Sequence, residues 1–146
     1  MEAFHDKSFD LIVSNAVLEH LRDPVLSFKE LSRITNDGGY GFHQVDFRFH
    51  QDFSRPLEFL LMPEAEQKKC IEDANFTTGN GWRASEYIKL FIANGFEIID
   101  FQPNMVVEEE YFNDFLRRLK NSASRYTNFD RNDLRVISAF FIVKKI

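Results

Sequence analysis

Apolar residues form a nearly unbroken run from Phe9 to Ser14, which predicts a parallel strand buried on both faces. A helix is expected to follow, because Asp23 is a favourable N-cap and Pro24 suits the first helical position. Apolar residues then recur on one helical face, at Val25, Phe28, Leu31 and Ile34. The pattern predicts that this helix ends at Asp37-Gly38-Gly39 and that a second strand runs from Tyr40 to Asp46.

Regular periodicity disappears between Phe47 and Trp82, which contains prolines, many Phe residues and a turn-prone Gly-Asn-Gly segment. We interpret residues 47–82 as a cap inserted into a single domain that spans residues 1–146. Periodicity returns with a helix from Ser85, a strand over Phe96–Phe101, an amphipathic helix around Tyr111–Leu119 and a strand over Leu134–Val143. Neither face of that last strand is polar, so it is expected inside the sheet. The alternation predicts an α/β fold.

Composition excludes several classes of partner. The formal net charge is −5 and no long run of like charges occurs, which argues against nucleic acid and against anionic membranes. Cys70 is the one cysteine, so no intrachain disulfide can form and a reducing compartment is expected. No apolar stretch approaches the ~20 residues of a membrane span, and the first residues lack a signal-peptide pattern. We therefore expect a cytoplasmic protein.

The segment from Phe9 to Pro24, with the Gly38-Gly39 break and the strand ending at Asp46, resembles one region of a known family. It is similar to the fourth-strand region of class I S-adenosylmethionine (SAM)-dependent methyltransferases. The resemblance implies a partial Rossmann-like sheet of strands 4, 5, 7 and 6, with the seventh strand antiparallel. The family's glycine-rich SAM loop and its acidic residue for the ribose have no counterpart here. The chain is thus expected to be the carboxyl-terminal part of such a fold.

The same resemblance implies a SAM cofactor in an intact or complemented form. It places the loop Ser14-Asn15-Ala16-Val17 beside the methionine part of SAM, with Asn15 and Ala16 as the foremost neighbours. The alternative is that these residues only turn the chain into the next helical segment.

Polar residues that could act on an acceptor follow both strands. Asp46, Arg48 and His50 leave the second strand, where they could respectively position an acceptor, hold its carboxylate or phosphate, and take its proton. An internal Asp–Arg or Asp–His hydrogen bond is the equally open alternative. His20 is a further candidate base, although a histidine that fixes the loop is favoured. Trp82 and Arg83 are candidate contacts for the acceptor, with Trp82 otherwise an anchor of the cap.

A metal site is not expected. His43, Asp46 and His50 could be read as ligands, but His43 lies inside a predicted strand and the three side chains need not converge.

Two functions follow from these observations. The first is methyl transfer from SAM to a small, partly apolar acceptor lodged under the cap. The second is a non-catalytic half-domain that associates through an exposed strand edge. That edge, Phe9–Ser14, carries no Lys, Pro or bulge, so a homodimer through it is expected, or a partner that supplies the missing half.

The first prediction concerns cofactor affinity. The 146-residue polypeptide should bind SAM weakly or not at all, because one wall of the site leaves most of the ligand in solvent. Calorimetric titration measures this directly. A single site per monomer with a dissociation constant of about a micromolar would contradict it.

Overall fold

The computed structural model describes residues 4–75 and 77–146. Five α-helices and four strands alternate along these residues, with three short 3₁₀ helices, η1 (Leu18–His20), η2 (Glu58–Leu61) and η3 (Arg125–Asn128). The strands are β1 (Phe9–Asn15), β2 (Thr35–Asp46), β3 (Phe96–Val106) and β4 (Val136–Lys145). The helices are α1 (Pro24–Ile34), α2 (Glu64–Asp73), α3 (Ala84–Ala93), α4 (Glu109–Lys120) and α5 (Arg131–Arg135). None of the helices in the described ranges is long and apolar enough to cross a membrane.

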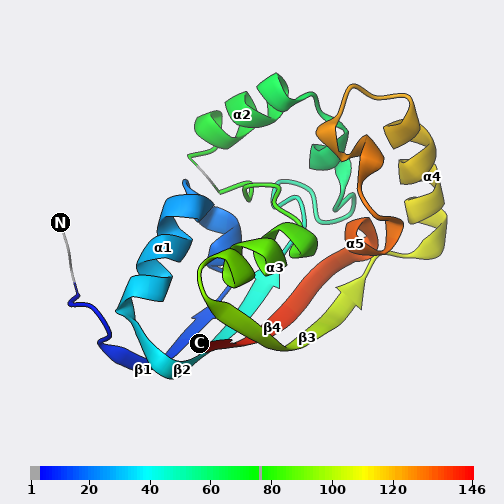
Figure 1. Ribbon diagram of the computed structural model, residues 1–146. Coiled ribbons are helices and arrows are strands. Elements are labelled where there is room, and N and C mark those ends of the chain that lie inside the picture. The colour runs from blue at the N-terminus through cyan, green and yellow to red at the C-terminus, as the bar shows by residue number, and fades with distance from the viewer. Residues whose placement is uncertain (1–3, 76) are drawn as a thin grey trace.

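The four strands form one sheet in the order β1-β2-β4-β3 (Figure 1). β1 pairs in parallel with β2, and β4 lies antiparallel between β2 and β3. This order confirms the predicted arrangement of strands 4, 5, 7 and 6. It also explains the apolar character of β4, which is an inner strand with neighbours on both edges.

Several predicted boundaries are wrong. Helix α1 ends at Ile34, and residues 35–39 already belong to β2 because Thr35 pairs with Phe9. Gly38 does take a left-handed conformation, with φ of 81°, but inside this early part of β2. Strand β3 continues past Phe101 to Val106, where successive register shifts let it follow β4.

One face of the sheet is covered and the other is open. Helices α1 and α3 pack on the first face, and no helix of the described residues covers the second (Figure 1). Apolar side chains on that second face are 39 to 67% exposed, namely Leu11, Val13, Tyr40, Phe42 and Phe140. The prediction that the first strand is buried on both faces is therefore wrong for this chain.

The covered face holds the first hydrophobic core. Phe28 of α1 meets Phe91 of α3 at 4.7 Å between ring centroids, and Tyr87 and Phe141 complete the aromatic contact between helices and sheet. Asp23 caps α1 as predicted, accepting a hydrogen bond from the Leu26 amide at 2.9 Å. Val25, expected on the inner face of α1, is 45% exposed at the first turn.

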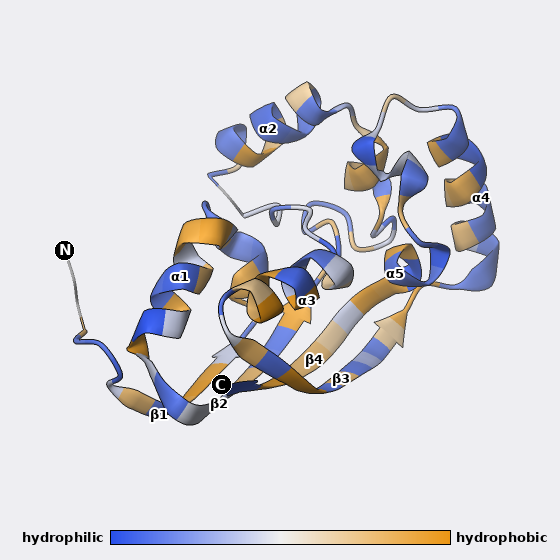
Figure 2. Cartoon of the chain, viewed as in Figure 1, coloured by the Kyte–Doolittle hydropathy of each residue, from blue (hydrophilic) through white to orange (hydrophobic). Residues whose placement is uncertain are grey.

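A second core lies beyond the end of the sheet at which β2 finishes, where α2 and α4 are found (Figure 1). Here residues of the 47–82 segment, such as Leu57 and Phe59, pack against Phe112 and Phe115 of α4. Hydrophobic colouring marks the inner side of α4 and the length of β4 (Figure 2). The many Phe residues of the sequence therefore fill two adjoining cores.

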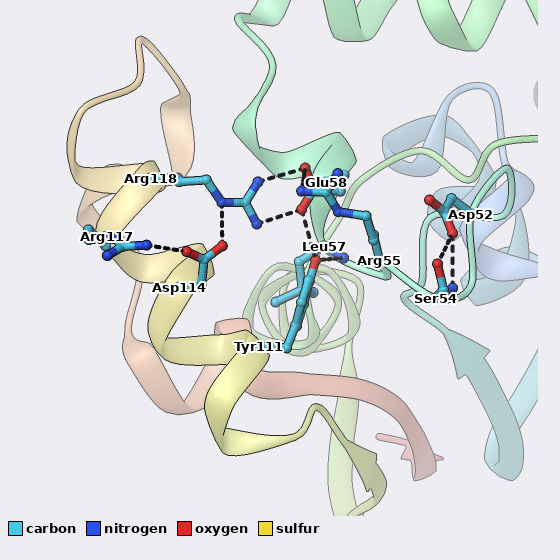
Figure 3. A network of polar contacts seen from close by, with 9 residues as sticks. All are labelled: Asp52, Ser54, Arg55, Leu57, Glu58, Tyr111, Asp114, Arg117 and Arg118. Carbon is cyan, nitrogen blue, oxygen red and sulfur yellow. Dashed lines mark hydrogen bonds and ion pairs between the residues drawn. The ribbon is translucent and has the colours of Figure 1, made fainter.

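A polar network fastens η2 to α4 along the rim of this second core (Figure 3). The guanidinium of Arg118 donates to both carboxylate oxygens of Glu58, at 2.8 and 2.7 Å. The Tyr111 hydroxyl accepts a hydrogen bond from the Leu57 amide at 3.0 Å. Paired donors of this kind fix orientation, so the 47–82 segment is held in register with the rest of the domain.

Candidate functional site

The loop that follows β1 has a strained backbone. Ala16 adopts a positive φ of 52°, which is uncommon for a residue other than glycine. Its amide donates to the Gln44 carbonyl at 3.1 Å, so the loop extends the pairing of β1 with β2 by one bond. Asn15, Ala16 and Val17 are exposed, whereas the Ser14 hydroxyl is bonded to His43 Nδ1 at 2.8 Å. Strain of this kind concentrates at functional sites.

The 3₁₀ helix η1 brings a buried carboxylate to the same end of the sheet. Glu19 is only 3% exposed, and its Oε1 accepts a hydrogen bond from the Asp46 amide at 3.3 Å. Its Oε2 is buried and has no hydrogen-bond partner. Burial raises the pKa of Glu19, although hydrogen bonds from the backbone oppose the shift.

Asn80 holds η1 in place. Its amide donates to the Glu19 carbonyl at 2.6 Å, and its side-chain nitrogen donates to the Leu18 carbonyl at 3.0 Å. The hydroxyl of Tyr87 also donates to the Leu18 carbonyl, at 3.0 Å. Sequence reasoning gave no role to the Glu19 side chain, which has no signal beyond its residue type.

Asp46 and Arg48 form the internal ion pair that was one of the two open alternatives. Arg48 Nη2 lies 2.6 Å from Asp46 Oδ2, and Arg48 Nε donates to Asp46 Oδ1 at 2.9 Å. Burial acts to raise the pKa of Asp46, but the hydrogen bonds and charge of Arg48 outweigh it and leave that pKa below its ordinary value. Arg48 is therefore paired with its own chain, and 29% of its side chain remains exposed.

His50 and His20 meet across the site. Their ring centroids are 4.8 Å apart in an edge-to-face arrangement, and His50 Nε2 lies 3.8 Å from Asp46 Oδ2. His50 Nε2 is buried without a hydrogen-bond partner. Burial lowers the pKa of His50, and the Asp46 charge offsets part of that effect. Glu19, His20 and His50 each offer a ligand atom, and these atoms lie within 4.8 Å of one another.

His43, once considered with Asp46 and His50 as a metal ligand, lies in the first core. It is 1% exposed, and its ring stacks on Phe91 at 5.4 Å between centroids. Burial lowers the pKa of His43 to about 4, so it is neutral at physiological pH. The polar partner of His43 is the Ser14 hydroxyl, and His43 does not lie together with Asp46 and His50.

Trp82 and Arg83 have different surroundings from one another. Trp82 is half-buried and its ring is tilted against Tyr87, with centroids 6.1 Å apart. Arg83 is fully buried and donates to the carbonyls of Phe47 at 3.2 Å and Leu134 at 3.1 Å, and to that of Val136. Its guanidinium thus joins two segments of backbone, the one at Phe47 and the one over residues 134–136, and it is buried away from the surface.

Two cavities lie on either side of Asn80 and Trp82. The first, about 10 Å³, is lined by Glu19 and Asp46 and has room for roughly one water. The second, about 590 Å³, lies between α2 and the start of α1 and is lined by residues that include Leu21 and Ile71. Both cavities have Asn80 and Trp82 in their walls. The second has the volume of a small-molecule site.

Comparison with known proteins agrees with this geometry. Residues 1–42 match the family described as "Methyltransferase domain". An uncharacterized methyltransferase of Schizosaccharomyces pombe is 49% identical over 81 residues, which is 55% of this chain and 29% of that protein.

Several solved structures with a similar fold are methyltransferases or come from a methyltransferase complex. A SAM-dependent methyltransferase from Mesorhizobium loti has a TM-score of 0.55 at 14% identity, over 99% of this chain and 66% of its own. One from Methanosarcina mazei has a TM-score of 0.51 at 22% identity, over 99% of this chain and 62% of its own. A third match comes from the Haloferax volcanii complex of the Trm112 methyltransferase activator with a methyltransferase. It has a TM-score of 0.52 at 14% identity, over 97% of this chain and 56% of its own.

These matches confirm the predicted resemblance to the SAM-dependent methyltransferases and to their Rossmann-like fold. By that resemblance the chain is related to enzymes of the methyltransferase class. It spans 29% of the curated relative and 56 to 66% of these solved structures, so it corresponds to part of their length.

The second prediction concerns Arg83. Replacing it with Met should lower the free energy of unfolding by about 3 kcal/mol or more, because three buried carbonyls lose their donor. Arg117→Met is the matched control, since the Arg117 side chain is 77% exposed, and it should change stability by less than about 0.5 kcal/mol. Urea unfolding followed by circular dichroism gives both values. Equal losses for the two variants would show that Arg83 has no special structural role.

Proposed function

We propose that this chain is the part of a SAM-dependent methyltransferase that contacts the methionine end of SAM and binds the methyl acceptor. The observation that carries the proposal is the strained Ala16 loop at the end of β1. This loop lies beside the polar residues Asp46, Arg48 and His50 at the end of β2. In open α/β sheets, ligands bind beyond the carboxyl ends of the strands. The exposed Asn15 and Ala16 are the proposed neighbours of SAM, with Ser14 and Val17 on either side.

The proposed acceptor is small and partly apolar. The cavity of about 590 Å³ supports this size, and Leu21, Ile71 and Trp82 supply apolar walls. Residues 47–82 would then act as a cap within a single domain of residues 1–146. Arg22 and Lys68 also line the cavity, so the acceptor could carry an anionic group.

Methyl transfer from a sulfonium proceeds by in-line attack, so the protein mainly positions the two reactants and sometimes removes a proton from the nucleophile. His50, His20 and Asp46 are the proposed groups for that second task, because they lie together where β2 ends. Two imidazoles can act on a nucleophile directly, as a base, or through a bound cation. We further propose a cytoplasmic location, on the ground that Cys70 is unpaired and only half-buried.

The third prediction tests His50. His50→Ala should lower turnover by about 10²-fold or more in any active longer or complemented form, with little change in SAM affinity. His5→Ala is the matched control, because His5 is an exposed histidine in the first described residues. Turnover is measured by the release of S-adenosylhomocysteine. Near wild-type turnover for His50→Ala would remove His50 from the reaction.

A second candidate function is a non-catalytic module that associates through β1. β1 is an edge strand of the sheet formed by the described residues, and Leu11 and Val13 on it are 55 and 67% exposed. The β1 edge carries no Lys or Pro, and its pairing with β2 is regular from Leu11 to Asn15. An apolar edge of this kind is a template for pairing with another strand. The proposed partner is a second copy of the chain, or a polypeptide that supplies the amino-terminal half of the fold.

The fourth prediction tests this association. The purified chain should sediment as a dimer at about 10⁻⁴ M, and Val13→Lys should shift it to monomer by placing a charge in the joined surface. Val25→Lys is the matched control, since Val25 is also an exposed valine but lies on α1, away from β1. Monomer for the unchanged chain would refute the homodimer. Loss of the dimer in both variants would mean that the contact is not at β1.

A further inference from the structure

Three side chains with metal-binding atoms converge where β1 and β2 end. Glu19 and His20 come from η1, and His50 comes from the segment that follows β2, about thirty residues later in the sequence. Their ligand atoms lie within 4.8 Å of one another. We infer that Glu19, His20 and His50 bind a divalent transition-metal ion of the zinc type.

The main support is a pair of polar atoms that the protein itself leaves unsatisfied. Glu19 Oε2 and His50 Nε2 are both buried without a hydrogen-bond partner, and Glu19 as a whole is 97% buried. Buried polar atoms in native proteins are nearly always bonded, and an unbonded pair calls for a water or an ion. A cation bound between these atoms would satisfy both at once, since a carboxylate oxygen and an imidazole nitrogen are both ligands.

The donor set selects the class of cation. Two imidazole nitrogens with one carboxylate oxygen are the ligands of Zn²⁺, Co²⁺ and related ions, whereas Ca²⁺ and Mg²⁺ prefer oxygen alone. Three protein ligands also leave the fourth position of a tetrahedral ion open for water or for another ligand. Asp46 lies next to these three residues, with its Oδ2 3.8 Å from His50 Nε2, and it is held in place by Arg48. Its negative charge would therefore favour a cation bound by the three ligands.

The separation of the ligand atoms is close to what such an ion needs. Around a tetrahedral Zn²⁺ with bonds of about 2.1 Å, ligand atoms lie roughly 3.4 Å apart. Closing the largest separation, at most 4.8 Å, to that value takes about 1.4 Å, which side-chain rotation supplies. The backbone around the group is already fixed, because the Glu19 carbonyl accepts from the Asn80 amide at 2.6 Å.

Cation binding changes the role of His50 in the reaction. A His50 nitrogen that binds a metal cannot take a proton from the acceptor. The cation would instead lower the pKa of a hydroxyl of the acceptor, whose proton then leaves to water before the oxygen attacks the methyl group of SAM and S-adenosylhomocysteine is released. This role in catalysis rests on the proposed methyl transfer, whereas cation binding itself does not. The two can therefore fail separately.

The test is a direct measurement of cation binding to the tag-free chain. After treatment with a chelator, the chain is titrated with Zn²⁺ by calorimetry and with Co²⁺ by visible absorption, which reports tetrahedral coordination. We expect one site per chain. His50→Ala and Glu19→Gln should each weaken binding at least about tenfold. His5→Ala should leave it unchanged, because His5 is exposed and lies outside the group.

Glu19→Gln keeps the size of the side chain, so it separates ligation from folding. Circular dichroism and the melting temperature of each variant, measured without metal, identify any that fail to fold. Absence of a site in the unchanged chain would overturn the inference and leave water as the partner of Glu19 Oε2. Equal affinity in all variants, or loss only in His5→Ala, would overturn it as well. Cation binding without methyl transfer would preserve this inference and contradict the proposed function.

Discussion

Parallel pairing of β1 with β2 is the constraint on which the site depends. The register that sets Asn15 opposite Gln44 makes both strands finish at the same end of the sheet. The Ala16 amide then bonds to the Gln44 carbonyl, which forces the loop into its left-handed turn beside Asp46. A ligand that lies beyond this end of the sheet meets the exposed Ala16 loop on one side. On the other side it meets the polar residues Asp46, Arg48 and His50.

Two polar side chains, Asn80 and Arg83, connect this geometry to the rest of the domain. Asn80 holds η1 against the loop that precedes α3, and Arg83 binds the carbonyls that follow β2 and precede β4. Each joins segments that are far apart in the sequence, so the 47–82 segment enters and leaves the sheet at defined points. The network between Glu58 and Arg118 then fixes the outer side of that segment against α4 (Figure 3). The position of His50 therefore depends on contacts from both ends.

The sequence predicted the order of elements well because hydrophobic periodicity and caps are local signals. Asp23 and Pro24 marked the start of α1, and the wholly apolar β4 indicated an inner strand. Burial of β1 could not be predicted from Phe9–Ser14 alone, since it depends on what lies over Leu11 and Val13. The end of α1 was misplaced because pairing with Phe9 overrides the helix-breaking signal of the glycines.

The site was predicted less completely than the fold. The loop after β1 and the residues after β2 lie near one another, because the carboxyl ends of parallel strands meet at one end of the sheet. The pairing of Arg48 with Asp46, two residues away, was one of the two alternatives that the sequence left open. The burial of Arg83 and the meeting of His20 with His50 depend on contacts between residues far apart in the sequence, which no local pattern encodes. Glu19 has no signal in the sequence beyond its residue type, yet it is a buried carboxylate that lies together with His20 and His50.

Amide chemical shifts of the ¹⁵N-labelled chain, recorded during titration with SAM to millimolar concentration, test the central claim most directly, since they detect weak binding residue by residue. The account predicts that the largest and saturable changes occur at Asn15, Ala16 and Val17, while Phe42 on the open face of the sheet is unaffected. Saturable changes confined to other residues would contradict the placement of SAM at the carboxyl end of β1.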